Sequence, residues 1–256
     1  MGSTHSTSWR YGILVLLMLG SLLTVMSLEP TPQNLAYHDF ADQRTFLGVP
    51  NALDIISNLP FLLVGILGLR YCIRADLGAG RLAWIVLFAG VSLVSVGSAY
   101  YHWAPSNGTL VWDRLPMTVG FMGLLAALLS EYVNHRLPRW ALTPAVLVGV
   151  ASVLYWHWTD DLRPYAWVQF FPLLTIPVVM VLFRPRYTHA WLLLVSLGWY
   201  VLAKVTEYFN VPIFELTKQV VSGHSMKHVL AAAGCYSILL MLQKRRPTSV
   251  AAANAG

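Results

Sequence analysis

Charged side chains are scarce in this chain of 256 residues. Asp, Glu, Lys and Arg make up 11% of the sequence, whereas apolar residues make up 57%, and the mean hydropathy is +0.59. So few charges cannot cover the surface of a soluble globular protein of this length. The scarcity of charge excludes a soluble globule and predicts an integral membrane protein.

Cysteine is also rare, because only Cys72 and Cys235 occur. Both lie in or beside apolar runs, where a thiol packs as a small apolar group, and no disulfide is expected. The chain also lacks an internal repeat, a low-complexity tract and a stretch that would form a soluble domain. These absences leave the apolar runs as the organising feature of the chain.

The apolar runs are long enough to cross a bilayer. A hydrocarbon core about 30 Å thick needs roughly 20 residues of helix, and backbone groups in lipid must be hydrogen-bonded internally. We therefore expect an all-α polytopic membrane protein with a seven-helix core. The seven spans are expected near residues 52–70, 82–102, 115–133, 139–157, 165–183, 189–206 and 221–242.

An eighth apolar run, near residues 11–28, precedes these seven. Arg10 followed by this run fits either a signal peptide or an uncleaved signal anchor. No small-residue cleavage site precedes Glu29, which favours an uncleaved helix. We expect three parts: a signal anchor or extra transmembrane helix (1–33), a seven-helix domain (34–243) and a basic, then polar cytoplasmic tail (244–256).

The basic residues predict the orientation of the spans. With the N-terminus inside and eight spans, most Lys and Arg residues fall in cytoplasmic segments, as expected for short basic loops. Such short loops and basic bias are typical of a bacterial inner-membrane protein. The net charge of +6 then reflects topology and contact with anionic headgroups, not nucleic-acid binding. The basic residues expected outside are Arg44, Arg114, Arg163 and Lys218.

Two histidines open the last apolar run and carry the clearest chemical signal. His224 and His228 are four residues apart, so a helix would place both imidazoles on one face, where they can bind the same metal ion. His102 ends the second strong span and reaches the same outer third of the membrane, because the two spans run in opposite directions. Three histidines would leave a zinc ion one open position, as in catalytic sites.

Two further polar residues are expected near these histidines. Asp113 lies at about the depth of His102 and is placed to act as a general base and acid. Ser98 precedes His102 by one turn and could hold a water molecule or donate to an oxyanion. Taken singly, Ser98 also fits a helix-packing role, and Asp113 fits a helix N-cap.

Oxygen ligands gather before the first strong span. Asp39, Asp42, Asn51 and Asp54 are close in sequence, and calcium prefers such ligands. The alternative is a solvated loop outside the membrane, with Asp54 favoured by the dipole at a helix N-terminus.

The motifs together resemble those of the alkaline ceramidases. These enzymes belong to a larger group of seven-helix membrane hydrolases that includes the adiponectin and progestin receptors. The resemblance rests on Ser98-x3-His102, Asp113-x-Leu-Pro-Met and His224-x3-His228, and it covers most of the chain. It implies a zinc ion held by the three histidines, with the aspartate and the serine as the catalytic pair beside it. The implied reaction hydrolyses the amide bond of ceramide to a sphingoid base and a fatty acid.

The resemblance also implies a calcium site, with Asp39 and Asp42 as its clearest counterparts. Two residues of this chain depart from the family pattern, which commonly has an asparagine near the place of Arg44 and a glutamate at Asn51. An arginine in this loop could itself replace the cation.

The sequence therefore favours a zinc-dependent lipid amidase whose membrane-lipid substrate enters from the bilayer, with no protein partner evident. One alternative is a receptor or sensor in which zinc is a structural staple. Another is a transporter, which would need paired charges near the membrane midplane. Few such pairs are evident, because Glu131 lies near a cytoplasmic end and Lys204 has Glu207 as a local partner.

Overall fold

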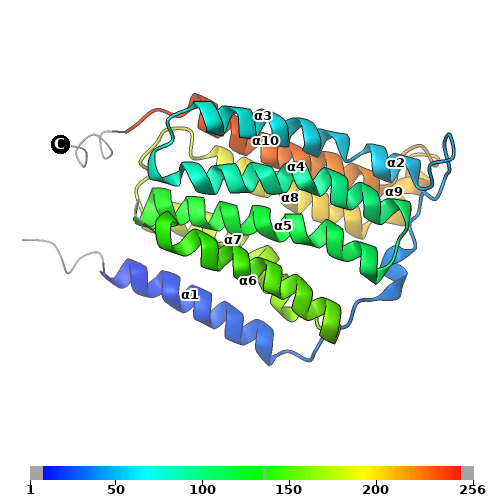
Figure 1. Ribbon diagram of the computed structural model, residues 1–256, viewed down its shortest axis with the longest axis horizontal. Coiled ribbons are helices and arrows are strands. Elements are labelled where there is room, and N and C mark those ends of the chain that lie inside the picture. The colour runs from blue at the N-terminus through cyan, green and yellow to red at the C-terminus, as the bar shows by residue number, and fades with distance from the viewer. Residues whose placement is uncertain (1–7, 135–136, 249–256) are drawn as a thin grey trace, which may run out of the picture.

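The computed structural model describes residues 8–134 and 137–248, and within these ranges it contains helices and no strand (Figure 1). The long helices are α1 (Ser8–Ser27), α3 (Leu59–Arg74), α4 (Arg81–Trp103), α5 (Asn107–Leu128), α6 (Pro138–Thr159), α7 (Arg163–Leu182), α8 (Leu192–Tyr208) and α10 (Gly223–Lys244). The shorter elements are η1 (Leu35–His38), α2 (Ala52–Ile56), η2 (Gly78–Gly80), η3 (Leu129–Val133) and α9 (Asn210–Leu216).

The helices confirm the predicted polytopic membrane architecture. In the described part of the chain, seven helical segments are long and apolar enough to cross a membrane, or up to eight if α8 and α9 form one span. These two helices meet at an angle of 80°. Each predicted span coincides with one of these segments, and the protein is an integral, multi-pass membrane protein.

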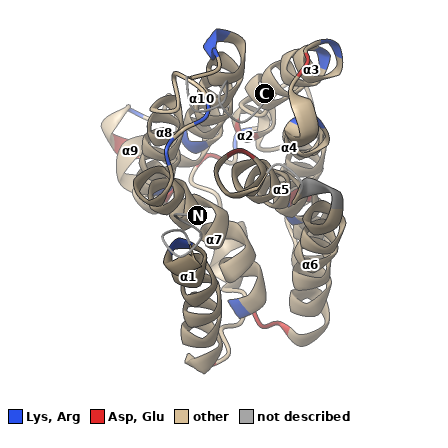
Figure 2. Ribbon diagram, turned by 90° about the vertical axis from the view of Figure 1, so that its left-hand side faces the viewer, with Lys and Arg blue, Asp and Glu red and all other residues tan. Residues whose placement is uncertain are grey.

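The long helices lie side by side in one bundle (Figure 1). The start of α1 and the end of α10 lie at the same end of the bundle, as an even number of crossings requires. Charged residues occur mostly near helix ends and in connections, while the helices between carry few (Figure 2). This distribution is the one a bilayer imposes, because a charge at membrane depth is costly.

Helices α4 and α5 approach each other closely, because small residues line their contact. A Cβ atom at Gly97 of α4 would lie 2.0 Å from the carbonyl oxygen of Trp112 on α5. At Gly90, a Cβ would lie 2.6 Å from the backbone nitrogen of Gly120. Since no larger side chain fits at these positions, the glycines determine how the two helices pack. This packing brings the C-terminal end of α4 beside the first turns of α5.

Helix α1 lies at the edge of the bundle against α7 (Figure 1). Trp167 of α7 donates to the Ser21 hydroxyl at 3.0 Å. Arg163 donates to the carbonyl oxygens of Met26 and Leu28 at 2.9 and 2.6 Å. These bonds fix the end of α1 to the start of α7. The division of the chain after residues 33 and 243 stays a prediction, and residues 249–256 of the expected tail lie outside the described residues.

Candidate active site

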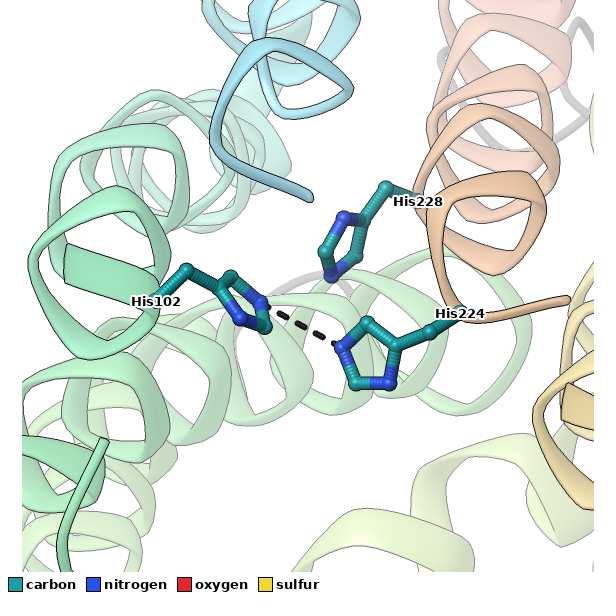
Figure 3. Close-up of side chains that lie close together, drawn as sticks. All are labelled: His102, His224 and His228. Carbon is teal, nitrogen blue, oxygen red and sulfur yellow. Dashed lines mark hydrogen bonds between the residues drawn. The ribbon is translucent and has the colours of Figure 1, made fainter. Parts of the chain in front are cut away.

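The three histidines expected at one site meet inside the bundle. His102 comes from the end of α4, whereas His224 and His228 lie one turn apart at the start of α10 (Figure 3). Their ring nitrogens, one from each residue, lie within 4.8 Å of one another. All three side chains are buried, at 4% exposure or less. In the described part of the chain, no other cluster of His, Cys, Asp or Glu has the geometry to hold a metal ion.

The spacing of the nitrogens fits a metal ion. The Nε2 atoms of His102 and His224 are 3.3 Å apart. Two nitrogens bound to one tetrahedral zinc ion, each about 2.0–2.1 Å from it, are separated by roughly 3.3–3.4 Å. Imidazole ligands suit zinc and its neighbours among the transition metals. The donor set and its separation are therefore compatible with zinc.

A hydrogen-bond relay orients His228. The Ser57 hydroxyl donates to the carbonyl oxygen of Asp54 at 2.9 Å, so its oxygen can accept from Nδ1 of His228 at 2.8 Å. A proton on Nδ1 leaves Nε2 without one and able to bind a metal. Metal-binding histidines generally have such a partner for their second nitrogen.

Asp54 holds the start of α10, and so it also positions both histidines of that helix. The Oδ1 atom of Asp54 accepts from the hydroxyls of Ser225 and Ser222 at 2.6 and 3.3 Å. Ser222 is the N-cap of α10, and its oxygen accepts from the backbone N–H of Ser225 at 3.0 Å. A Cβ at Gly223 would lie 2.1 Å from the carbonyl oxygen of Thr206, so α10 begins in close contact with α8.

Arg44 forms an ion pair with Asp42, one of the carboxylates expected to bind calcium. Its Nε and Nη2 atoms donate to the two oxygens of Asp42, both at 2.7 Å, and Nη2 also donates to the carbonyl oxygen of Val220 at 3.1 Å. Burial acts to raise the pKa of Asp42, but the hydrogen bonds and the charge of Arg44 outweigh it and lower the pKa below its ordinary value. A protein cation therefore compensates this carboxylate.

The other side chains expected to bind calcium also have protein partners. Asp39 accepts from Gln43 at 2.7 Å. Asn51 donates to the carbonyl oxygen of His102 at 2.8 Å, and Asp54 caps α10 as described. No described contact brings these side chains together, so calcium binding stays a prediction.

Asp113 near the N-terminal end of α5 and Ser98 near the C-terminal end of α4 lie together. Helix α5 begins at Asn107, eight residues earlier than expected, with Ser106 as its N-cap. The possibility that Asp113 is an N-cap is therefore wrong, because Asp113 lies in the second turn. Ser98 hydrogen-bonds the Asp113 carboxylate, and both side chains are at most 9% exposed.

A cavity of about 340 Å³ begins at this end of the bundle. Along α5 and α10 its lining changes from polar to apolar, since on α5 Asp113 is followed by Gly120 and Leu124, and on α10 His228 is followed by Ile238. The polar part of the cavity is formed by Ser98, Asp113, Arg114, Glu207, Lys227 and His228. The apolar part includes Phe61, Leu87, Val91, Phe121, Leu124 and Ile238. A cavity of this shape fits a molecule with a polar group and a hydrocarbon chain.

A charged cluster that the sequence analysis missed lines the polar part. The predicted pair of Lys204 and Glu207 is present on α8. However, Glu207 also accepts from Lys227 of α10 at 2.6 Å and from the Tyr37 hydroxyl at 3.1 Å. The presence of Lys227 within a predicted span was a signal that it has an acidic partner. Identifying Glu207 as this partner requires the packing of α8 against α10.

Arg114 is the second missed residue. Its expected place in a loop outside the membrane is wrong, because it lies within α5 and is 6% exposed. The error follows from placing the start of this helix too late in the chain.

Comparison with known proteins agrees with these motifs. The family model described as Ceramidase matches residues 49–190. No curated protein matches the chain at a significant level. The matched segment includes Ser98, His102 and Asp113, while His224 and His228 follow it and are brought to them by the fold. Because the match covers more than half of the length of this chain, the chain belongs to the Ceramidase family.

Proposed function

We propose that this protein is a zinc-dependent intramembrane hydrolase that cleaves the amide bond of ceramide or a related N-acyl lipid, releasing a fatty acid and an amine. Membership of the Ceramidase family supports hydrolysis of an amide bond. The observation that carries the proposal is the convergence of three buried imidazoles beside the cavity lined by Asp113 and Ser98.

His102, His224 and His228 would hold the zinc ion. Bound there, zinc supplies a Lewis acid that polarises a carbonyl group and makes water more acidic. Within the polar part of the cavity, the Asp113 carboxylate accepts a proton from the attacking water. A bond forms between the water oxygen and the amide carbon, the C–N bond breaks, and Asp113 passes the proton to the departing nitrogen. Ser98 orients the carboxylate by its hydrogen bond.

A lateral route from the bilayer supports a lipid substrate. A second, almost wholly apolar groove lies between α1, α7 and α8. It shares Ala166, Phe170, Leu173, Tyr200 and Lys204 with the cavity. A lipid could thus pass from the membrane to the site without leaving an apolar environment, and its acyl chain would occupy the apolar part of the cavity.

We further propose that the site lies toward the periplasmic side of a bacterial inner membrane, with the end of α10 in the cytoplasm. The basis is the bias of Lys and Arg toward the opposite ends of the helices. The proposed mechanism has no step that needs calcium, and Arg44 already pairs with Asp42.

The test is release of free fatty acid from a panel of N-acyl lipids by the purified protein. Hydrolysis should stop when a chelator removes zinc and return when zinc is added. His224→Ala should lose metal and activity, while Asp113→Ala should keep the metal and lose activity by about 10²-fold or more. Turnover by the metal-free protein would overturn the mechanism. Zinc that stabilises the protein without any fatty acid release would favour a receptor with a structural metal.

A further inference from the structure

Arg114 is a buried cation that the proposed chemistry does not use. Its side chain lines the polar part of the cavity, directly after Asp113 in the chain. The guanidinium carbon lies 4.0 Å from the ring centre of Trp156 and 4.6 Å from that of Tyr165. Its Nη2 atom donates to the side-chain oxygen of Gln33 at 2.6 Å. These neutral contacts fix the position of the guanidinium plane.

The guanidinium has hydrogen-bonding capacity left over. Among the described residues, its buried Nη1 atom has no hydrogen-bond partner. In the same part of the chain, Arg114 forms no ion pair with an Asp or Glu side chain. Burying a charged donor without an acceptor is unfavourable. Arginine presents N–H groups in a fixed plane that matches the two oxygens of a carboxylate. Arg114 is therefore prepared to bind an anionic group that enters the cavity.

The other charges of the cavity also favour an anion. Lys204 and Lys227 share the single carboxylate of Glu207. Asp113 is the remaining acidic residue in the lining, and Arg114 is the remaining basic one. The lining thus has an excess of one positive charge, before any metal ion is counted. A substrate with a negative charge would reduce this excess, whereas an uncharged lipid would not.

The place of Arg114 identifies which half of the substrate carries the charge. The apolar part of the cavity extends away from Arg114 along α5, by roughly 1.5 Å for each residue. The acyl chain would lie there, so the group near Arg114 belongs to the amine half. We propose that the substrate is an N-acyl compound with a carboxylate close to the amide nitrogen, such as an N-acyl amino acid, and that Arg114 binds this carboxylate. The inference rests on the proposed amidase function.

Substrate pairs test this without altering the protein. N-acyl glycine and its methyl ester have the same acyl chain and amide bond and differ in the negative charge. We expect the protein to hydrolyse the acid with kcat/KM higher than for the ester by about tenfold or more. Equal values, or a preference for the ester or for ceramide, would overturn the inference and leave the amidase function standing. Absence of hydrolysis for every lipid would instead refute the amidase function.

A second pair separates carboxylate from phosphate. N-acyl ethanolamine phosphate carries more negative charge than N-acyl glycine, and N-acyl ethanolamine is its uncharged counterpart. We expect the ratio of kcat/KM between N-acyl ethanolamine phosphate and N-acyl ethanolamine to be smaller than the ratio between N-acyl glycine and its methyl ester. A larger gain for the phosphate would overturn the assignment of a carboxylate.

Variants then assign the effect to Arg114. Arg114→Gln should abolish the preference for the acid, mainly through KM, and Arg114→Lys should retain part of it. Arg70→Gln is the control, because it removes the same charge from an exposed position on α3. Retention of the full preference by Arg114→Gln would overturn the inference.

Binding provides a readout that does not need turnover. In the His224→Ala background, N-acyl glycine should raise the thermal unfolding temperature more than its ester does. Adding Arg114→Gln should remove this difference, and a difference that persists would overturn the inference.

Discussion

Ser57 determines which nitrogen of His228 faces the other two histidines. Its hydroxyl donates to the Asp54 carbonyl and accepts from Nδ1 of His228. Without the Ser57 hydroxyl, Nδ1 of His228 loses an acceptor, so a neutral His228 carries its proton on Nδ1 less readily and binding of a metal at Nε2 becomes less favourable.

Ser57→Ala should therefore weaken zinc binding by about 10–100-fold while leaving the fold intact. Competition with a chromophoric chelator measures the affinity, and circular dichroism checks the helix content. Ser27→Ala is the matched control, because within residues 8–134 and 137–248 that hydroxyl bonds only the Thr24 carbonyl of its own helix. An unchanged zinc affinity in Ser57→Ala would contradict the assigned relay.

At the residue scale, the spacing of residues in the sequence predicted which side chains share a helix face, but the sequence did not predict how deeply a side chain is buried. Four-residue spacing was sufficient to place His224 and His228 on one face of a helix. The opposite directions of α4 and α10 then placed His102 near them. Arg114 could not be placed in the same way, because its burial between two aromatic rings depends on α5 beginning at Asn107. Its neighbours in the sequence, Asp113 and Leu115, gave no sign of that burial.

At the scale of elements, the contact between α4 and α5 positions the proposed catalytic groups. Gly97 lies against the backbone of Trp112, and the adjacent residues Ser98 and Asp113 are hydrogen-bonded to each other. A side chain at Gly97 must push the two helices apart, because its nearest neighbours are backbone atoms. The distance between Ser98 and Asp113 would then increase.

Gly97→Ala should lower the stability of the protein by about 1–3 kcal/mol, as overpacking does, and should also lower activity. Gly198→Ala is the matched control, because a Cβ atom there meets nothing within 4 Å. That control should be neutral or more stable by up to about 1 kcal/mol, since alanine favours helix. Thermal unfolding in detergent and fatty acid release measure the two effects. Equal stability of the two variants would argue against the close packing of α4 and α5.

The elements themselves were the most predictable part of the chain, since a bilayer requires about 20 apolar residues for each crossing. Their ends were less predictable. The first turn of α5 contains Asn107, Gly108 and Thr109, which resemble a loop by composition. Asn210 and Pro212 at the start of α9 are a local signal for a break after α8, but they do not give the angle of 80° between the two helices, which depends on how α9 packs.

At the scale of the whole molecule, the apolar groove between α1, α7 and α8 and the cavity beside the histidines form one route for the substrate. Helices α7 and α8 line both, whereas α1 contributes to the groove and α4, α5 and α10 contribute to the cavity. The sequence predicted lateral entry of a lipid but not the place of entry, because this place depends on the packing of helices distant in sequence. Ala166 is suited to a test, since it lines both spaces and has a small side chain.

Ala166→Trp should obstruct passage between the groove and the cavity. We expect KM to rise several-fold for a long-chain substrate in vesicles, with a smaller change in kcat, because the reacting groups are unaffected. A short-chain substrate, which needs less room to pass, should be affected less. Leu194→Trp is the control, because this residue of α8 is 45% exposed and lines neither space. An equal effect of both variants would indicate that bulk on the lipid-facing surface is responsible. An unchanged KM in Ala166→Trp would mean that the substrate reaches the histidines by another path.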